Sequence, residues 1–237
     1  SVKASVDRSM PNGVSPLSVS SQGGFQEVVR VLLGAKAAVN QILHKGAFPL
    51  MLAGHKNRLG VVKVLLAAKA FIDQLYNGAT TLFMAIHQDK PAIAELLITA
   101  KASVNLSYTD GTSPLSLACQ KGSGAAVTQL LAAKAEIEQC NASDTSPLAV
   151  ACQAGQTSVV RILLDAKASV DRRNNSGMSA LGAACRYGHA ETATVMVNAG
   201  ADYRNVDKMS RSAVKLAEKH GHTKVVTALL ECLQAIA

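Results

Sequence analysis

Residues 113–122 read SPLSLACQKG, and residues 146–155 repeat that pattern as SPLAVACQAG. The match continues downstream, because residues 127–138 (VTQLLAAKAEIE) align with residues 160–171 (VRILLDAKASVD) at the same interval of 33. Each copy holds two short apolar stretches, which are too small to enclose a core alone. A period of this length predicts a solenoid in which successive copies stack and bury each other's apolar faces.

The same pattern recurs seven times along the 237 residues. We expect repeats to start near residues 8, 41, 74, 106, 139, 172 and 205 and to form one domain over residues 1–237. Residues 1–7 match the end of a repeat, so we interpret them as the tail of a truncated preceding copy. The third repeat is one residue short, and the loss falls in the loop between Ala70 and Thr80.

Two helices are predicted in each repeat. The first opens at a pair such as Ser113-Pro114, because the hydroxyl caps a free N–H and Pro has no N–H to satisfy. Phe48 occupies the capping position in the second repeat, which predicts a helix start weaker by about 1 kcal/mol. The first helices are expected to end at residues that tolerate positive φ, namely Gly24, Asn57, Asp89, Gly122, Gly155, Gly188 and Gly221.

The second helices carry apolar stripes at spacings of three and four. Examples are Val28/Val29/Leu32/Leu33, Val61/Val62/Leu65/Leu66 and Val159/Val160/Leu163/Leu164. Connectors between repeats contain pairs that favour hairpin turns. These pairs are Asn12-Gly13, Lys45-Gly46, Asn77-Gly78, Asp110-Gly111 and Ser176-Gly177.

Segments such as DGTSPLSLACQKG (residues 110–122), Gly188-His-Ala-Glu and Asn198-Ala-Gly-Ala-Asp202 resemble ankyrin repeats, and the resemblance covers the whole chain. It implies an all-α solenoid of stacked helix-turn-helix repeats with projecting β-hairpin-like connectors, and a role in binding other proteins. The His that follows Pro-Leu in the family is absent, which predicts a softer stack. Its place is taken by Ser18, Met51, Phe83, Ser116, Ala149, Gly182 and Lys215.

Lysine stands where the family usually has Gly after the second helix. The positions are Lys3, Lys36, Lys69, Lys101, Lys134 and Lys167, with Gly only at Gly200, and the last five lysines form the candidate basic edge. A left-handed conformation there costs a non-Gly residue about 1–2 kcal/mol, and a cation at a helix C-terminus returns about 0.3–1 kcal/mol. Two interpretations stand: a basic edge that tracks an acidic surface, or a solvated helix cap copied by repeat duplication.

Composition indicates a folded chain, with 49% hydrophobic residues, a formal net charge of +8 and no apolar run long enough to cross a membrane. Cys119, Cys152 and Cys185 are spaced by 33 and fall on copies about 10 Å apart, too far for disulfides. We therefore expect reduced, buried thiols and a reducing intracellular compartment.

No catalytic constellation is apparent, since Gly-rich phosphate loops, GxSxG and HExxH are missing from the sequence. His220 and His222 form an H-x-H pair without further ligands at metal-binding spacing. Cys140, on a connector, lacks a neighbouring base. We predict a non-enzymatic protein without cofactor or metal.

The family resemblance places partner contacts on the residues before the inter-helix turn and on the connector tips. The helix positions are His55, Lys56, His87, Gln88, Gln120, Lys121, Gln153, Arg186, Tyr187, Lys219 and His220, and the tip residues are Leu43, Tyr76 and Tyr108. Carboxylates are missing from this set, which favours an acidic or polar partner. Tip residues can equally fold back onto a neighbouring connector.

The leading hypothesis is therefore a protein-interaction scaffold, and the positive mean hydropathy of +0.18 favours membership of a larger assembly. Nucleic-acid binding through the basic edge is the alternative, against which stand 3% aromatic residues and a charge that looks spread over the repeats. A regulatory or targeting arm of a larger enzyme or channel is a third.

Overall fold

The computed structural model describes residues 6–8, 14–43, 46–204, 206–209 and 211–236. The predicted turns at Asn12-Gly13 and Lys45, and the tail before Val6, lie outside these residues. Two compact units divide the chain, Ser1–Thr109 and Asp110–Ala237, and each is described by itself.

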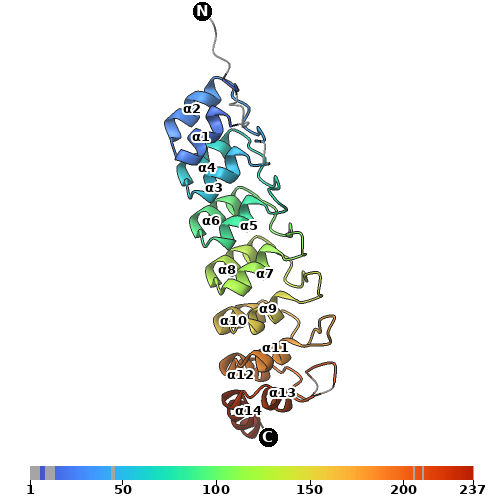
Figure 1. Ribbon diagram of the computed structural model, residues 1–237. Helices are drawn as coiled ribbons and strands as arrows, with labels where there is room; N and C mark the ends of the chain where they lie inside the picture. The colour runs from blue at the N-terminus through green and yellow to red at the C-terminus, as the bar shows by residue number, and fades with distance from the viewer. Residues whose placement is uncertain (1–5, 9–13, 44–45, 205, 210, 237) are drawn as a thin grey trace, which may run out of the picture. The chain divides into compact units, whose positions relative to one another are not determined.

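The N-terminal unit consists of three helix pairs (Figure 1). They are α1 (Pro16–Gly23) with α2 (Gln26–Gly34), α3 (Pro49–His55) with α4 (Leu59–Ala67), and α5 (Thr81–His87) with α6 (Pro91–Thr99). First helices pack on first helices, and second helices on second helices, so the unit has two helical layers. The connectors emerge along one side of the pairs (Figure 1).

The C-terminal unit repeats this arrangement four times. Its pairs are α7 (Pro114–Lys121) with α8 (Gly124–Ala132), α9 (Pro147–Gln153) with α10 (Thr157–Asp165), α11 (Ala180–Tyr187) with α12 (Ala190–Asn198), and α13 (Ala213–Lys219) with α14 (Thr223–Ile236). Side chains also tie neighbouring pairs together, since the His189 ring contacts the Gln153 carbonyl at 3.0 Å and the His222 ring contacts the Arg186 carbonyl at 2.9 Å. The predicted all-α solenoid is confirmed in both units.

Helix starts follow the prediction. Six of the seven first helices have a Ser or Thr whose hydroxyl accepts a backbone N–H, as Ser113 does from Ser116 at 3.1 Å. Phe48 makes no cap hydrogen bond, as predicted, but its side chain is buried in the core. The first helices end one or two residues before the expected residues, all of which have positive φ.

The apolar stripes form much of the core, although in α2 only Val29 is buried. Val61 and Val159 are fully buried in α4 and α10, whereas Val28, at the same position of α2, is 50% exposed. The prediction that a neighbouring repeat covers Val28 is wrong, since Val28 instead borders an open apolar hollow together with Arg8 and Val14. Asp7 nevertheless accepts the Ala38 N–H at 2.9 Å, just as Asn40 accepts the Phe71 N–H at 2.8 Å one repeat later.

The connectors are turns with little β-structure. Asn77 and Gly78 have φ of 49° and 81°, and Tyr76 and Ala79 exchange backbone hydrogen bonds of 2.9 and 3.0 Å across them. Arg173 and Ser179 form a second isolated bridge, around the predicted Ser176-Gly177 turn. The other described connectors contain no paired strands, although backbone hydrogen bonds close their turns, as from the Leu43 N–H to the Ala47 carbonyl at 2.8 Å.

Candidate functional site: a polar groove and a basic edge

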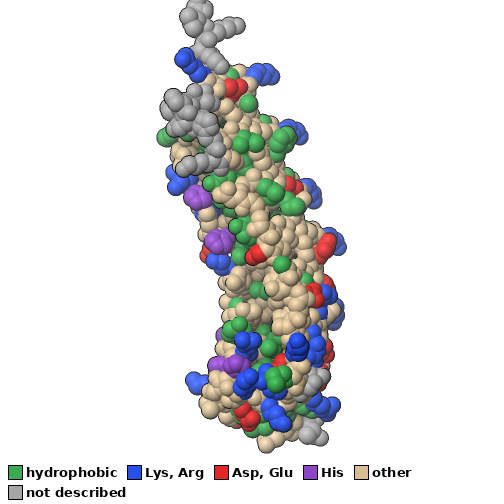
Figure 2. All heavy atoms as spheres, turned by 45° about the vertical axis from the view of Figure 1, so that its right-hand side comes forward, with side chains coloured by type: hydrophobic (Ala, Val, Ile, Leu, Met, Phe, Trp, Pro, Cys, Tyr) green, Lys and Arg blue, Asp and Glu red, His purple; other side chains and the backbone are tan. Residues whose placement is uncertain are grey.

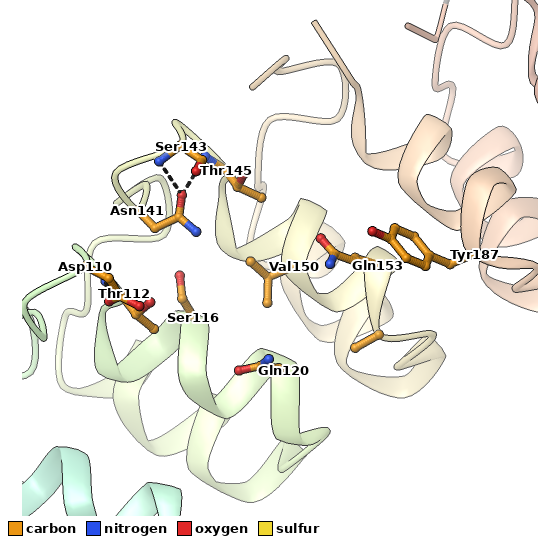
Figure 3. Close-up of a pocket in the computed structure, with 11 residues that line it drawn as sticks. Asp110, Thr112, Ser116, Gln120, Asn141, Ser143, Thr145, Val150, Gln153 and Tyr187 are labelled. Atoms are coloured by element: carbon orange, nitrogen blue, oxygen red, sulfur yellow. Dashed lines mark hydrogen bonds between the residues drawn. The ribbon is translucent and has the colours of Figure 1, made fainter. Parts of the chain in front are cut away.

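A groove of about 510 Å³ lies in the C-terminal unit, where α7, α9 and a connector converge (Figure 3). Its lining residues are Asp110, Thr112, Ser116, Gln120, Asn141, Ser143, Thr145, Val150, Gln153, Ala154 and Tyr187. Most of them are uncharged hydrogen-bonding side chains, and Asp110 brings the one carboxylate among them. A smaller hollow continues past Thr145 and Gln153 to Arg186 and Tyr187.

Helix register explains how the helical side chains meet. Ser116 and Gln120 are four residues apart on α7, and Val150 and Gln153 are three apart on α9, so each pair shares a face. The two glutamines occupy the same position of successive repeats, about 10 Å apart. Tyr187 points from α11 toward Gln153 (Figure 3) and is half exposed.

The connector wall is built by Asn141. Its side-chain oxygen accepts the backbone N–H groups of Ser143 at 3.0 Å and Thr145 at 3.1 Å (Figure 3). Asn174 holds the next connector in the same way, through the N–H groups of Ser176 and Met178. This geometry keeps the hydroxyl-bearing residues at the rim of the groove.

Ser116 is the unsatisfied group of the site. Its side chain is 1% exposed, and its hydroxyl has no hydrogen-bond partner among the described residues. Ser18, at the same position of the first repeat, donates instead to the Ser15 carbonyl at 2.7 Å. An unpaired buried hydroxyl costs about 1–3 kcal/mol, and Ser116 points toward the groove (Figure 3).

The predicted contact residues fall into separate groups. Gln120, Gln153 and Tyr187 line the groove and Arg186 lines the adjoining hollow, whereas Lys121, Lys219 and His220 are exposed outside both. In the N-terminal unit His55, Lys56 and His87 are exposed and Gln88 is half-buried.

Two of the predicted contact histidines, His55 and His220, have a lowered pKa and so carry less positive charge than their residue type indicates. Partial burial, then the charges of Lys90 and Lys56, lower the pKa of His55 below its ordinary value of 6.5. Burial, Arg186 and Lys219 lower the pKa of His220 in the same way. The charged form of both imidazoles is therefore disfavoured, which favours hydrogen bonding over charge at these two positions.

The connector tips show both predicted arrangements, an exposed side chain and a side chain that folds back onto a neighbouring connector. The Tyr108 ring folds back and stacks on Phe83, with centroids 5.3 Å apart, and remains 36% exposed. Leu43 and Tyr76 are half-buried. Their neighbours Ile42 and Leu75 are the exposed ones.

The basic edge has the backbone geometry that its sequence position predicts. Lys36, Lys69, Lys101, Lys134 and Lys167 are all exposed and have φ between 65° and 69°. Each closes a helix, as where the Lys134 N–H donates to the Leu131 carbonyl at 3.0 Å and the Ala135 N–H to the Leu130 carbonyl at 2.9 Å. All five therefore occupy a conformation that Gly adopts without strain.

Sequence reasoning missed the connector half of the groove. Asn141, Asn174 and Asp207 recur at intervals of 33, and that periodicity was the available signal for the turns they organise. Ser116 was visible only as a departure from the family pattern. No group of three or more His, Cys, Asp or Glu that could hold a metal occurs among the described residues, and none of the described helices is long and apolar enough to span a membrane.

Comparison with known proteins gives one family. A family model described as ankyrin repeats (3 copies) matches residues 17–108, 67–139, 82–174, 115–207 and 167–236. The crystal structure of the human ASB11 ankyrin repeat domain is similar, with a TM-score of 0.76 and 26% sequence identity over 92% of this chain and 98% of that chain. The search of curated proteins found no match.

Proposed function

The chain belongs to the ankyrin repeat family, whose domains generally mediate protein–protein interactions, and we propose that it is a non-enzymatic scaffold that binds a partner through its polar groove. The observation that carries this proposal is the convergence of Gln120, Gln153 and Tyr187 on one groove of about 510 Å³. Groove amides present donors and acceptors together, so a polar, extended protein segment suits them.

Charged residues at the two ends of the groove and hollow support the same proposal. Arg186 at the far end of the hollow favours a carboxylate there, and Asp110 at the near end favours a donor. Membership of a larger assembly and a reducing intracellular compartment remain part of the proposal.

Site-specific cross-linking tests it. A photoreactive side chain placed at Gln120 or Gln153 should give discrete protein adducts in an extract of the source cells, and the same group at Asp165, exposed on α10, should not. Adducts at Asp165 alone, or none at either groove position, would contradict the proposal.

The basic edge supports a second candidate, an acidic-surface binder. The supporting observation is that five lysines hold a conformation in which Gly would be unstrained. Replacing Lys36, Lys69 and Lys101 by Asn checks this candidate. The variant should lose binding to an acidic protein or a nucleic acid, and binding by wild type should depend steeply on salt. A salt-independent interaction that survives the replacements contradicts it.

A further inference from the structure

The connectors of the N-terminal unit expose more apolar surface than their folding requires. Ile42, Phe71 and Leu75 are 61%, 63% and 50% exposed, and Leu106 and Tyr108 are exposed beside them. We call these five residues the connector surface. Exposed apolar groups gathered in this way mark interaction sites more often than isolated ones do.

Two of these residues, Phe71 and Leu106, have no large apolar equivalent in the other repeats. Phe71 follows its lysine by two positions, where the other repeats have Ala38, Ser103, Glu136 and Ser169. Leu106 follows by five, where the others have Gln41, Gln74, Gln139 and Arg172. The repeat architecture therefore tolerates polar residues at these positions, and folding does not explain the apolar ones.

Hydrogen bonds from backbone N–H groups to side-chain oxygens hold the three connectors side by side. The Asn40 side chain accepts the N–H of Phe71 at 2.8 Å, and the Asp73 side chain accepts the N–H of Ser103 at 2.9 Å. Tyr108 lies close to the Gly78 turn, because a Cβ built there would be 3.5 Å from its ring. In the upper part of Figure 2, hydrophobic side chains accordingly form a patch with Lys and Arg side chains beside it.

The positive charge of the N-terminal unit indicates which kind of partner fits the connector surface. Residues 1–109 contain eleven Lys and Arg against five Asp and Glu, whereas residues 110–237 contain thirteen against eleven, so the charge is not spread evenly as its sequence pattern first indicated. Exposed Lys36, Lys69 and Lys101 begin the same connectors. Two of the five carboxylates, Asp7 and Asp73, already accept backbone N–H groups.

We propose that the connector surface docks a protein segment that combines apolar side chains with carboxylates. The apolar groups cover Ile42, Phe71 and Leu75, and the carboxylates pair with the lysines at the edge. Nucleic acid fits less well, since three of the five side chains are aliphatic and offer no stacking face. This inference goes beyond the proposed function, because it uses a different surface and a different unit.

Peptide selection tests it without knowledge of the natural partner. A displayed library of random peptides is selected on the 237-residue chain and rescreened against Ile42→Ser/Phe71→Ser/Leu75→Ser. Phe71→Ser and Leu75→Ser each introduce the residue that the next repeat already has, Ser103 and Ser107, so the variant should fold, which its melting curve checks. Val31→Ser, on exposed Val31 of α2, is the matched control.

We expect the clones that bind wild type but not the triple variant to combine Asp or Glu with Leu, Ile or Phe. Their affinity should fall about tenfold or more in the triple variant and should stay unchanged in Val31→Ser. It should also fall in Lys36→Asn/Lys69→Asn/Lys101→Asn and at high salt. Asn tolerates the left-handed conformation, so that variant removes charge alone.

Three outcomes would overturn the proposal. Clones that bind both proteins equally place the binding surface elsewhere. Clones without acidic residues refute the role of charge. The third outcome concerns vesicles of equal parts phosphatidylserine and phosphatidylcholine. If the protein sediments with these vesicles only when Ile42, Phe71 and Leu75 are intact, and no selected peptide depends on those residues, the surface binds a membrane instead. The groove cross-links at Gln120 and Gln153 are unaffected by any of these results.

Discussion

At the scale of single residues, the lysine caps carry a backbone cost that a substitution can remove. Lys134 has φ of 68° at the end of α8, where a residue with a Cβ is about 1–2 kcal/mol worse than Gly. Its charge at the helix C-terminus returns about 0.3–1 kcal/mol. We predict that Lys134→Gly raises the free energy of unfolding in urea by up to about 1 kcal/mol.

Two further variants separate strain from charge in this experiment. Lys134→Asn removes the charge but tolerates left-handed geometry, so it should fall between wild type and Lys134→Gly. Lys134→Gln removes the charge and keeps the strain, so it should be less stable than wild type. If the Gly and Gln variants have the same stability, backbone strain does not govern this position.

The buried cysteines make a prediction about pH. Burial raises the pKa of Cys119 and Cys185 from 9.0 to about 12 and raises that of Cys152 further. The folded state keeps these thiols protonated while the unfolded state loses its protons above pH 9. Stability should therefore be unaffected by them below pH 9 and fall between pH 9 and 12.

Replacing all three thiols by Ala should flatten that part of the stability curve, measured as urea midpoints across the pH range. The same burial predicts that iodoacetamide at pH 8 labels half-buried Cys140 and Cys232 in the native protein, and all five cysteines only after unfolding. Rapid native labelling of Cys152 would refute the burial.

At the scale of secondary-structure elements, Phe48 has two opposite effects on stability, because it leaves a helix uncapped but fills the core. Phe48 leaves α3 without a side-chain cap, at a cost of about 1 kcal/mol. The same side chain is fully buried, and removing a buried Phe costs about 3–5 kcal/mol. We predict that Phe48→Ser lowers the free energy of unfolding by about 2–4 kcal/mol, whereas Ser113→Ala, which removes only a cap, lowers it by about 1 kcal/mol.

The helices could be predicted because each carries its own local signals. Ser113-Pro114 and Gly122 mark the start and the end of α7 in the sequence, although its stability comes from packing. The groove could not be predicted this way, because it requires α7, α9 and the turn organised by Asn141 to meet in space. Gln120 and Gln153 were found through the family resemblance, while Ser116 needed the structure to show that its hydroxyl lacks a partner.

At the scale of the whole molecule, sequence periodicity predicts which positions are equivalent but not whether a neighbour covers them. Val28 and Val61 occupy the same place in successive repeats and belong to the same apolar pattern, yet one is 50% and the other 1% exposed. The difference arises because α3 and α4 have a preceding helix pair packed against them, whereas α1 and α2 have none among the described residues. Ile42 and Leu75 likewise read as ordinary connector residues until their exposure is known.

This dependence predicts different costs for one substitution at two equivalent positions. Val61→Lys places a charge inside a packed layer and should lower the free energy of unfolding by more than about 4 kcal/mol or prevent folding. Val28→Lys leaves the ammonium in water and should cost less than about 1 kcal/mol. Urea unfolding of both variants measures the contrast, with wild type as the reference. Comparable losses would show that the outer face of α1 and α2 is covered in solution, and a loss only at Val61 would show that stacking, rather than residue type, determines which apolar positions stabilise the protein.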